Sequence, residues 1–253
     1  MNNQIVLPRI LQIGAGASSE VGNVMAGLGC ARPLIVTDRM MVQLGYVNRL
    51  QDCLADSEIY DDTLPEPTEA SILAGVEKVK SGDFDSIIAL GGGSSIDSAK
   101  AIAILGKYGG DMRDYMVPRV VNEPGLPIIA IPTTAGTGSE CQSYAIIADA
   151  ETHVKMACGD KKAAAKIAIL DPELTLTQPS NVTSHTGIDA ISHAIETSVT
   201  TKRNDISYQY SKLAFDLLNE SFESVIKNPK DIEARSKMML GAAYAGTAIE
   251  SSM

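Results

Sequence analysis

The chain has 253 residues, of which 45% are hydrophobic and 4% aromatic, with no tryptophan, so it can bury one large aliphatic core or two modest ones. Its 31 acidic and 21 basic side chains give a net charge of −10, which disfavours nucleic acid and anionic membranes as partners. No apolar stretch approaches the roughly 20 residues of a spanning helix, and the first thirty residues have no secretory pattern. We therefore expect a cytoplasmic protein whose four cysteines are reduced thiols.

The first part of the chain alternates short aliphatic runs with segments of helical periodicity. Strands are expected at 10–13, 34–36, 86–90 and 128–132, and helices at 19–28, 68–80 and 95–105. Runs that are apolar on both faces and joined by helices are typical of a parallel sheet covered on both sides. The sequence therefore predicts an α/β domain built on a parallel sheet.

After about residue 171 the strand-like runs stop and the periodicity becomes helical. Helices are expected near 181–200, 205–227 and 231–250. We predict an α/β domain at 1–178 and an all-helical domain at 179–253. Residues 241–253 have the small side chains of a closely packed helix but no glycine cap, proline or polar tail, so we expect the helical domain to be incomplete.

A strand-to-helix turn with the sequence ALGGGSSID contains three consecutive glycines. Glycines let a backbone approach an oxyanion closely, and the first turn of the following helix offers unpaired N–H groups at the positive end of its dipole. Gly91, Gly92, Gly93 and Ser94 are therefore candidates for binding a phosphate. The alternative is a tight structural turn in which Ser94 caps the helix and Asp97 lies in its first turn.

An earlier turn, Gly14-Ala15-Gly16, resembles the start of a dinucleotide-binding fingerprint, but the third glycine of that motif is absent. A purely structural turn is the simpler interpretation. Asp38 follows a strand-like run about twenty residues later, where a carboxylate can accept the hydroxyls of an adenosine ribose and repel a 2′-phosphate. A solvated turn aspartate is the alternative for Asp38.

A second polar loop follows the aliphatic run at 128–132. It contains Thr133, Thr134 and Thr137 among small residues and glycines. Such a loop supplies neutral hydrogen-bond donors to a cofactor or substrate, but a plain surface loop has the same composition.

Asp189 and His193 are four residues apart in a predicted helix. This spacing places them on one face, about 6 Å apart along the axis. A carboxylate and a neutral imidazole suit Fe²⁺ or Zn²⁺, but two ligands are not a complete site, and a solvated helix-face pair is the alternative. The other histidines, His153 and His185, complete no triad and are expected at the surface.

Four motifs in chain order resemble those of the iron-containing (group III) alcohol dehydrogenase family. They are GGGSSIDSAK at 91–100, PTTAGTGSE at 132–140, DPEL at 171–174 and TGIDAISHAIE at 186–196. The resemblance covers essentially the whole chain. It implies a dehydroquinate synthase-like fold, in which a parallel-sheet dinucleotide-binding domain precedes an all-helical metal-binding domain and the active site lies in the cleft between them.

The resemblance also implies roles for individual residues. The implied NAD-binding residues are Asp38, Gly91, Gly92, Gly93, Ser94, Thr133, Thr134, Thr137 and Lys155. Asp189 and His193 match the first two ligands of a catalytic Fe²⁺, for which Zn²⁺ is the alternative. Gln142 and His185 stand where relatives usually have other residues, which could bear on the choice of substrate.

The implied activity is hydride transfer between NAD(H) and a small primary alcohol, diol or aldehyde, with the metal acting as a Lewis acid on the substrate oxygen. Asp38 favours NAD over NADP, and the family implies a homo-oligomer. Family members continue beyond this length and supply two further histidine ligands. The alternative is therefore a truncated or split form that binds the dinucleotide without turnover, or a fragment of a longer active enzyme.

Overall fold

The computed structural model describes residues 10–149, 151–152 and 154–253. Its centre is a six-stranded sheet in which every neighbouring pair is parallel, with the strand order β1-β8-β5-β4-β2-β3. The strands are β1 (Ile10–Ile13), β2 (Pro33–Val36), β3 (Glu58–Tyr60), β4 (Ser86–Gly91), β5 (Ile128–Pro132) and β8 (Ile167–Leu170). The sheet confirms the predicted α/β fold class, although β3 and β8 were not predicted.

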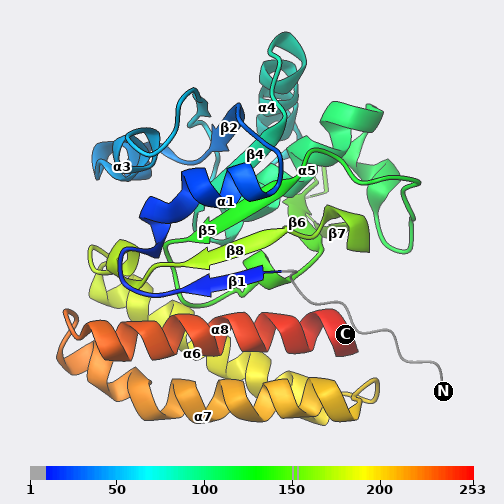
Figure 1. The fold of residues 1–253 in the computed structure, drawn as a ribbon. Helices are drawn as coiled ribbons and strands as arrows, with labels where there is room; N and C mark the ends of the chain where they lie inside the picture. Colours follow the sequence, from blue (N-terminus) through cyan, green and yellow to red (C-terminus); the bar gives the residue numbers. More distant parts are fainter. Residues whose placement is uncertain (1–9, 150, 153) are drawn as a thin grey trace.

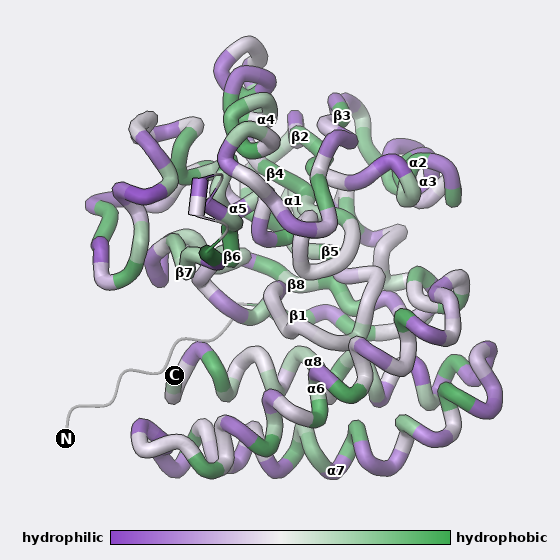
Figure 2. Tube along the Cα trace, turned by 180° about the vertical axis from the view of Figure 1, so that it is seen from behind, coloured by the Kyte–Doolittle hydropathy of each residue, from purple (hydrophilic) through white to green (hydrophobic). Residues whose placement is uncertain are grey.

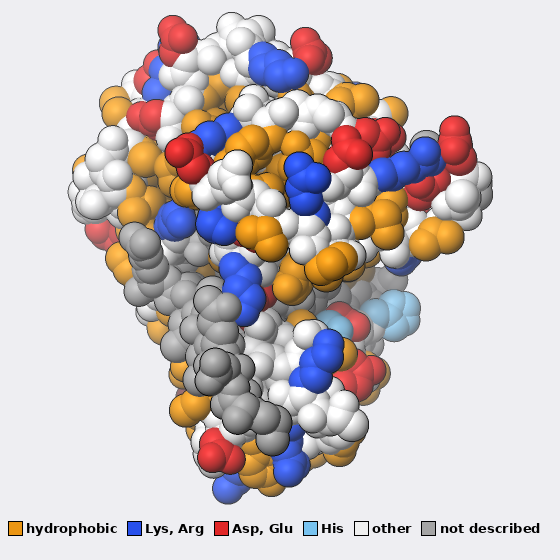
Figure 3. Space-filling model, turned by 90° about the vertical axis from the view of Figure 1, so that its right-hand side faces the viewer, with side chains coloured by type: hydrophobic (Ala, Val, Ile, Leu, Met, Phe, Trp, Pro, Cys, Tyr) orange, Lys and Arg blue, Asp and Glu red, His pale blue; other side chains and the backbone are white. Residues whose placement is uncertain are grey.

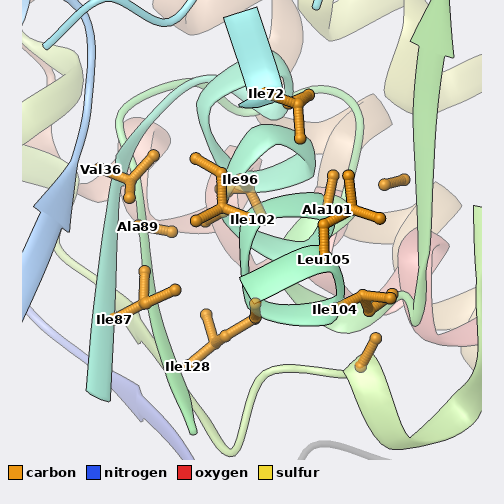
Figure 4. Packing of buried hydrophobic residues seen from close by; sticks show 14 of the residues in the cluster. Val36, Ile72, Ile87, Ala89, Ile96, Ala101, Ile102, Ile104, Leu105 and Ile128 are labelled. Atoms are coloured by element: carbon orange, nitrogen blue, oxygen red, sulfur yellow. The ribbon is translucent and has the colours of Figure 1, made fainter. Parts of the chain in front are cut away.

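Helices cover both faces of this sheet (Figure 1). They are α1 (Val21–Gly27), α2 (Arg39–Gln43), α3 (Tyr46–Gln51), α4 (Glu69–Ser81) and α5 (Gly93–Tyr108). Successive strand residues point to opposite faces, so Ile88 joins the core beneath α1 and α3 whereas Ile87 joins the core beneath α4 and α5. Figure 4 shows the second of these cores, in which Ile96 and Ile102 of α5 face Ile87 and Ala89 of β4.

An antiparallel hairpin lies apart from the main sheet. Its strands are β6 (Tyr144–Ala148) and β7 (Lys155–Gly159). Ala145 and Ile147 are buried in the core of α5, while Ile146 between them is 43% exposed. The short 3-10 helices are η1 (Ala17–Glu20), η2 (Met112–Tyr115), η3 (Ser139–Cys141), η4 (Lys161–Ala163) and η5 (Pro172–Thr175).

Three long helices form a layer below the sheet, and α7 lies farthest from the sheet both in the ribbon of Figure 1 and in the tube of Figure 2. They are α6 (Ser180–Val199), α7 (Asp205–Lys227) and α8 (Ile232–Ser252), which confirms the three predicted helices. Asn204 begins α7 with a capping box, and Asp231 caps α8 by accepting the N–H of Ala234. Among the described residues, none of the helices combines the length and apolar character that a membrane crossing requires.

The helical layer and the α/β part share a core. Leu170 of β8 and Cys141 of η3 pack with Ala190 of α6 and Ala242 of α8. The division of the chain into domains at 1–178 and 179–253 stays a prediction.

Candidate active site

The glycine-rich turn joins β4 to α5 and leaves the first turn of the helix open. Gly92 is the N-cap of α5, and no described side chain accepts a hydrogen bond from the first N–H groups there. Gly91 has a φ of 142°, and a Cβ on it would lie 2.5 Å from the hydroxyl of Ser95, so only glycine fits. The structural alternative expected Ser94 to cap the helix. Its hydroxyl instead donates to the carbonyl of Pro65. The helix start therefore suits an anion.

Asp38 lies beside this turn, where β2 leads into α2. Its Oδ1 accepts the backbone N–H groups of Met40 at 2.8 Å and Met41 at 3.2 Å, so the carboxylate is the N-cap of α2. Its Oδ2 lies 3.5 Å from the hydroxyl of Ser95 in the first turn of α5. Two helix starts thus meet at Asp38, and the carboxylate has a defined position rather than that of a freely solvated turn residue.

Two cavities meet at the glycine turn. The larger, of about 1040 Å³, includes these predicted residues in its lining: Asp38, Gly92, Gly93, Ser94, Thr133, Thr134 and Thr137. The smaller, of about 560 Å³, is lined by Lys155, Asp189 and His193 among others. Four residues line both cavities, namely Pro65, Gly93, Ser94 and Thr137. Since the cavities share these residues, the predicted cofactor residues and the Asp189/His193 pair border two cavities that adjoin at the glycine turn, which together are called the shared cleft. Gly91 lies next to it but lines neither cavity.

Asp189 and His193 lie on one face of α6, as their spacing predicts. His193 Nε2 is 3.7 Å from Asp189 Oδ1, and Figure 3 shows pale-blue histidine side chains beside acidic ones at the junction of the sheet and helical parts. The Nδ1 atom of His193 is buried without a hydrogen-bond partner among the described residues. A carboxylate oxygen and an imidazole nitrogen at this separation fit two ligands of one divalent cation. Within the described ranges, no group of three or more His, Cys, Asp or Glu side chains has the arrangement of a metal site.

The remaining predicted polar residues differ in their surroundings. Lys155 lines the smaller cavity from β7 and forms an ion pair with Glu66 at 3.1 Å. Gln142 lines the same cavity, and its side-chain amide donates at 2.7 Å to the backbone carbonyl of Thr137, in the loop at 133–138 that follows β5 and is called the threonine loop below. His185 is exposed on α6 and lines neither cavity, whereas His153 lies outside the described residues.

The Gly14-Ala15-Gly16 turn has a structural role, which agrees with the simpler interpretation of its sequence. The buried carboxylate of Asp171 accepts the N–H of Gly16 at 3.0 Å and the N–H and hydroxyl of Ser18 at 3.1 and 2.6 Å. Arg49 lies 3.5 Å from the same carboxylate. Because Asp171 already supplies an anion to these N–H groups, a phosphate has no place there.

Comparison with known proteins identifies the family. Residues 8–172 match "Iron-containing alcohol dehydrogenase", and residues 183–253 match "Fe-containing alcohol dehydrogenase family, C-terminal". The chain belongs to the iron-containing alcohol dehydrogenase family. It is 37% identical over 246 residues to the NAD-dependent methanol dehydrogenase of Bacillus methanolicus, covering 96% of this chain and 65% of that protein. The chain therefore spans slightly less than two thirds of that relative.

Solved structures of similar proteins have the same fold. A 1,3-propanediol oxidoreductase superimposes with a TM-score of 0.94 at 28% identity, covering 99% of this chain and 66% of the other. A sulfoacetaldehyde reductase from Bifidobacterium kashiwanohense, solved in complex with NAD⁺, gives 0.92 at 29% identity, covering 98% of this chain and 67% of the other.

Several residues that line the shared cleft of this protein were not predicted from the sequence. Those that line the smaller cavity include Glu66, Asp97, Ser139, Tyr144, Ile146 and Glu196. Asp97, Ser139 and Glu196 fall inside the family motifs, which is a signal that could have found them. Tyr144 and Ile146 belong to the unpredicted hairpin, whose place depends on contacts with α5.

Glu140, in the motif at 132–140, predicts a dependence of stability on pH. Its side chain is 4% exposed, and burial raises the pKa of its carboxyl to about 7, although its own backbone N–H and Lys100 oppose the shift. The folded protein thus keeps a proton that the unfolded chain releases near pH 4.5. The contribution of Glu140 to the free energy of unfolding is therefore fully present below about pH 4.5 and is lost as the pH rises to about 7.

We expect the substitution Glu140→Gln to remove this loss, which amounts to about 3 kcal/mol at most. Urea unfolding of both proteins at about pH 5 and about pH 8 measures it. The wild type should lose stability between these pH values relative to the variant, and identical pH profiles would show that Glu140 is not the group responsible.

Proposed function

We propose that this chain binds NAD(H) in the shared cleft and takes part in metal-dependent hydride transfer between NAD(H) and a small primary alcohol, diol or aldehyde. The observation that carries the proposal is that the two cavities adjoin at the glycine turn. Gly93, Ser94 and Thr137 line both cavities, and we place one extended ligand across them, from Asp38 to the Asp189/His193 pair. The NAD-dependent methanol dehydrogenase and the NAD⁺ complex among the relatives support the same cofactor.

In this arrangement the pyrophosphate binds at the open start of α5, at Gly91, Gly92, Gly93 and Ser94. Asp38 accepts the hydroxyls of the adenosine ribose, and Thr133, Thr134 and Thr137 line the path between the two cavities. The nicotinamide then lies in the smaller cavity, where Lys155 reaches the cofactor from β7 after leaving Glu66. The substrate enters the same cavity beside the nicotinamide.

Asp189 and His193 would hold the cation, with Fe²⁺ as the first candidate and Zn²⁺ as the second. A bound divalent cation supplies a Lewis acid for the substrate oxygen. Catalytic metal sites use about three protein ligands and an open position, and the described residues provide a pair. This observation favours a second candidate function, namely dinucleotide binding without turnover.

Calorimetric titration of the 253-residue protein with NADH and with Fe²⁺, followed by an alcohol oxidation assay, separates the two candidates. We expect NADH to bind and Fe²⁺ to bind weakly, with Fe²⁺ binding abolished in His193→Ala. NADH formation from short alcohols with added Fe²⁺ or Zn²⁺ would favour the enzyme, and binding without turnover would favour the second candidate. A protein that does not bind NADH would contradict both.

The choice between NAD and NADP depends on the charge of Asp38. Asparagine caps helices as well as aspartate does, so Asp38→Asn should keep the start of α2 while removing the charge that repels a 2′-phosphate. We expect NADPH affinity to rise by about tenfold, equivalent to about 1.4 kcal/mol, with little change in the melting temperature. Fluorescence titration with NADH and NADPH measures the effect, and an unchanged preference would place the discrimination elsewhere.

A further inference from the structure

Helix α5 carries a fully buried lysine, Lys100, about two turns after the glycine turn. Its Nζ donates to the hydroxyl of Ser139 at 2.7 Å and to the carbonyl of Tyr144 at 2.8 Å, and it lies 3.4 Å from Asp97 Oδ1. A buried ammonium group is costly unless it is paired and hydrogen-bonded. These three oxygens match the three donors of the ammonium, so the lysine fixes their relative positions.

Asp97 extends the same network. Its Oδ1 also accepts the hydroxyl of Ser139, and its Oδ2 accepts the backbone N–H of Ile146 at 2.9 Å. The partners of the Asp97–Lys100 pair therefore belong to η3 and to two positions of β6. Ser139, Tyr144 and Ile146 line the smaller cavity together with Asp97, whereas Lys100 lines neither cavity.

We propose that Lys100 and Asp97 are positioning residues that hold the η3–β6 wall of the smaller cavity in register with the glycine turn. This inference rests on the proposed function, because it assigns that wall to the nicotinamide end of the dinucleotide. Gly93 and Ser94 begin the helix that carries the pair, so α5 sets both the phosphate position and the opposite wall. The contacts of the pair lie on the smaller cavity, and the adenosine end in the larger cavity is independent of them.

The test compares two ligands, NADH and ADP-ribose, which lacks the nicotinamide. In Lys100→Met we expect ADP-ribose affinity to stay within about twofold of wild type and NADH affinity to fall by about tenfold or more, as for the loss of hydrogen bonds to a charged group. The control is Lys107→Met, the same substitution on the same helix. Lys107 contacts Glu123 and the carbonyl of Pro124 and lines neither cavity, so both affinities should be unchanged.

A merely structural role would lower both affinities together, so the ratio of the two dissociation constants is the decisive measurement. An unchanged ratio in a folded Lys100→Met protein, whether both affinities are kept or both fall equally, would overturn the inference. If Lys100→Met does not fold, Asp97→Asn is measured in the same way, because it keeps the shape of the side chain and weakens the same network, and an unchanged ratio there would also overturn the inference. Failure of wild type to bind either ligand would contradict the proposed function instead.

Discussion

Replacing Gly93 with alanine is expected to weaken NADH binding by about 10- to 100-fold, corresponding to an overpacking cost of about 1–3 kcal/mol. A Cβ on Gly93 would lie 2.7 Å from both Oγ1 and Cγ2 of Thr137. The threonine is not free to turn away, because its hydroxyl accepts the N–H of Ser139 at 3.2 Å and its side chain is β-branched. Both residues line the junction of the two cavities, so the displacement falls where the pyrophosphate is proposed to bind.

The matched control is Gly27→Ala at the end of α1. A Cβ there meets nothing within 4 Å, and alanine is favoured over glycine in a helix by about 0.5–1 kcal/mol. Fluorescence titration with NADH and thermal unfolding should show unchanged affinity and equal or higher stability for this control. Normal NADH affinity in Gly93→Ala would mean that the proposed cofactor does not cross the junction at Gly93.

Gly246→Ala is expected to cause the largest loss of stability, about 3 kcal/mol or more. Helix α8 crosses the threonine loop at Gly138, and a Cβ on Gly246 would lie 2.2 Å from the carbonyl oxygen of Gly138. Backbone cannot move aside as the end of a flexible side chain can. The helix would have to separate from the loop. This separation would also weaken the buried hydrogen bonds from Ser143 to Glu250 at 2.9 Å.

A second glycine of α8 provides the comparison for this prediction. A Cβ on Gly241 would lie 2.7 Å from Cγ of Leu218 and 3.0 Å from its Cδ2, so side-chain atoms rather than backbone take up most of the overlap. Urea unfolding should therefore rank Gly246→Ala as more destabilising than Gly241→Ala, with Gly27→Ala at or above wild type. The opposite ranking would mean that α8 does not pack on the loop as described.

The predicted elements agree with the structure where a helix buries a continuous stripe of apolar side chains or a strand buries a continuous apolar run. The helices expected near 181–200, 205–227 and 231–250 are α6, α7 and α8 within two residues at each end. Strand β8 was missed although it pairs with β1 on one side and β5 on the other. Its four aliphatic residues follow an alanine-rich segment, and a run this short does not distinguish a strand from a buried helix.

From the residues alone the candidate site is predicted as separate pieces, and only the family resemblance implies that they meet. The Asp189/His193 pair follows from helical spacing, and the open start of α5 follows from a strand that ends in glycines. Their meeting at adjoining cavities does not follow from either local pattern, because Gly93 and Asp189 are 96 positions apart and loop length says little about where two segments meet. Ser94 shows the same limit, since its hydroxyl has a partner, Pro65, that no local pattern predicts.

Local periodicity by itself indicated the α/β class and the three long helices, and the family motifs were identified by their resemblance in short runs of sequence, since each of these depends on residues within a few turns or one strand. Only the tertiary structure decided which glycine turn stays open. Asp171 closes the turn at Gly16 from 155 residues away, whereas no described side chain caps the start of α5 at Gly92. Burial of Lys100 was decided in the same way, because its hydrogen-bond partners Ser139 and Tyr144 come from segments that reach it only when the chain folds. The physical reason is that hydrogen bonding and burial depend on distance in space, which spacing along the chain fixes only within one element.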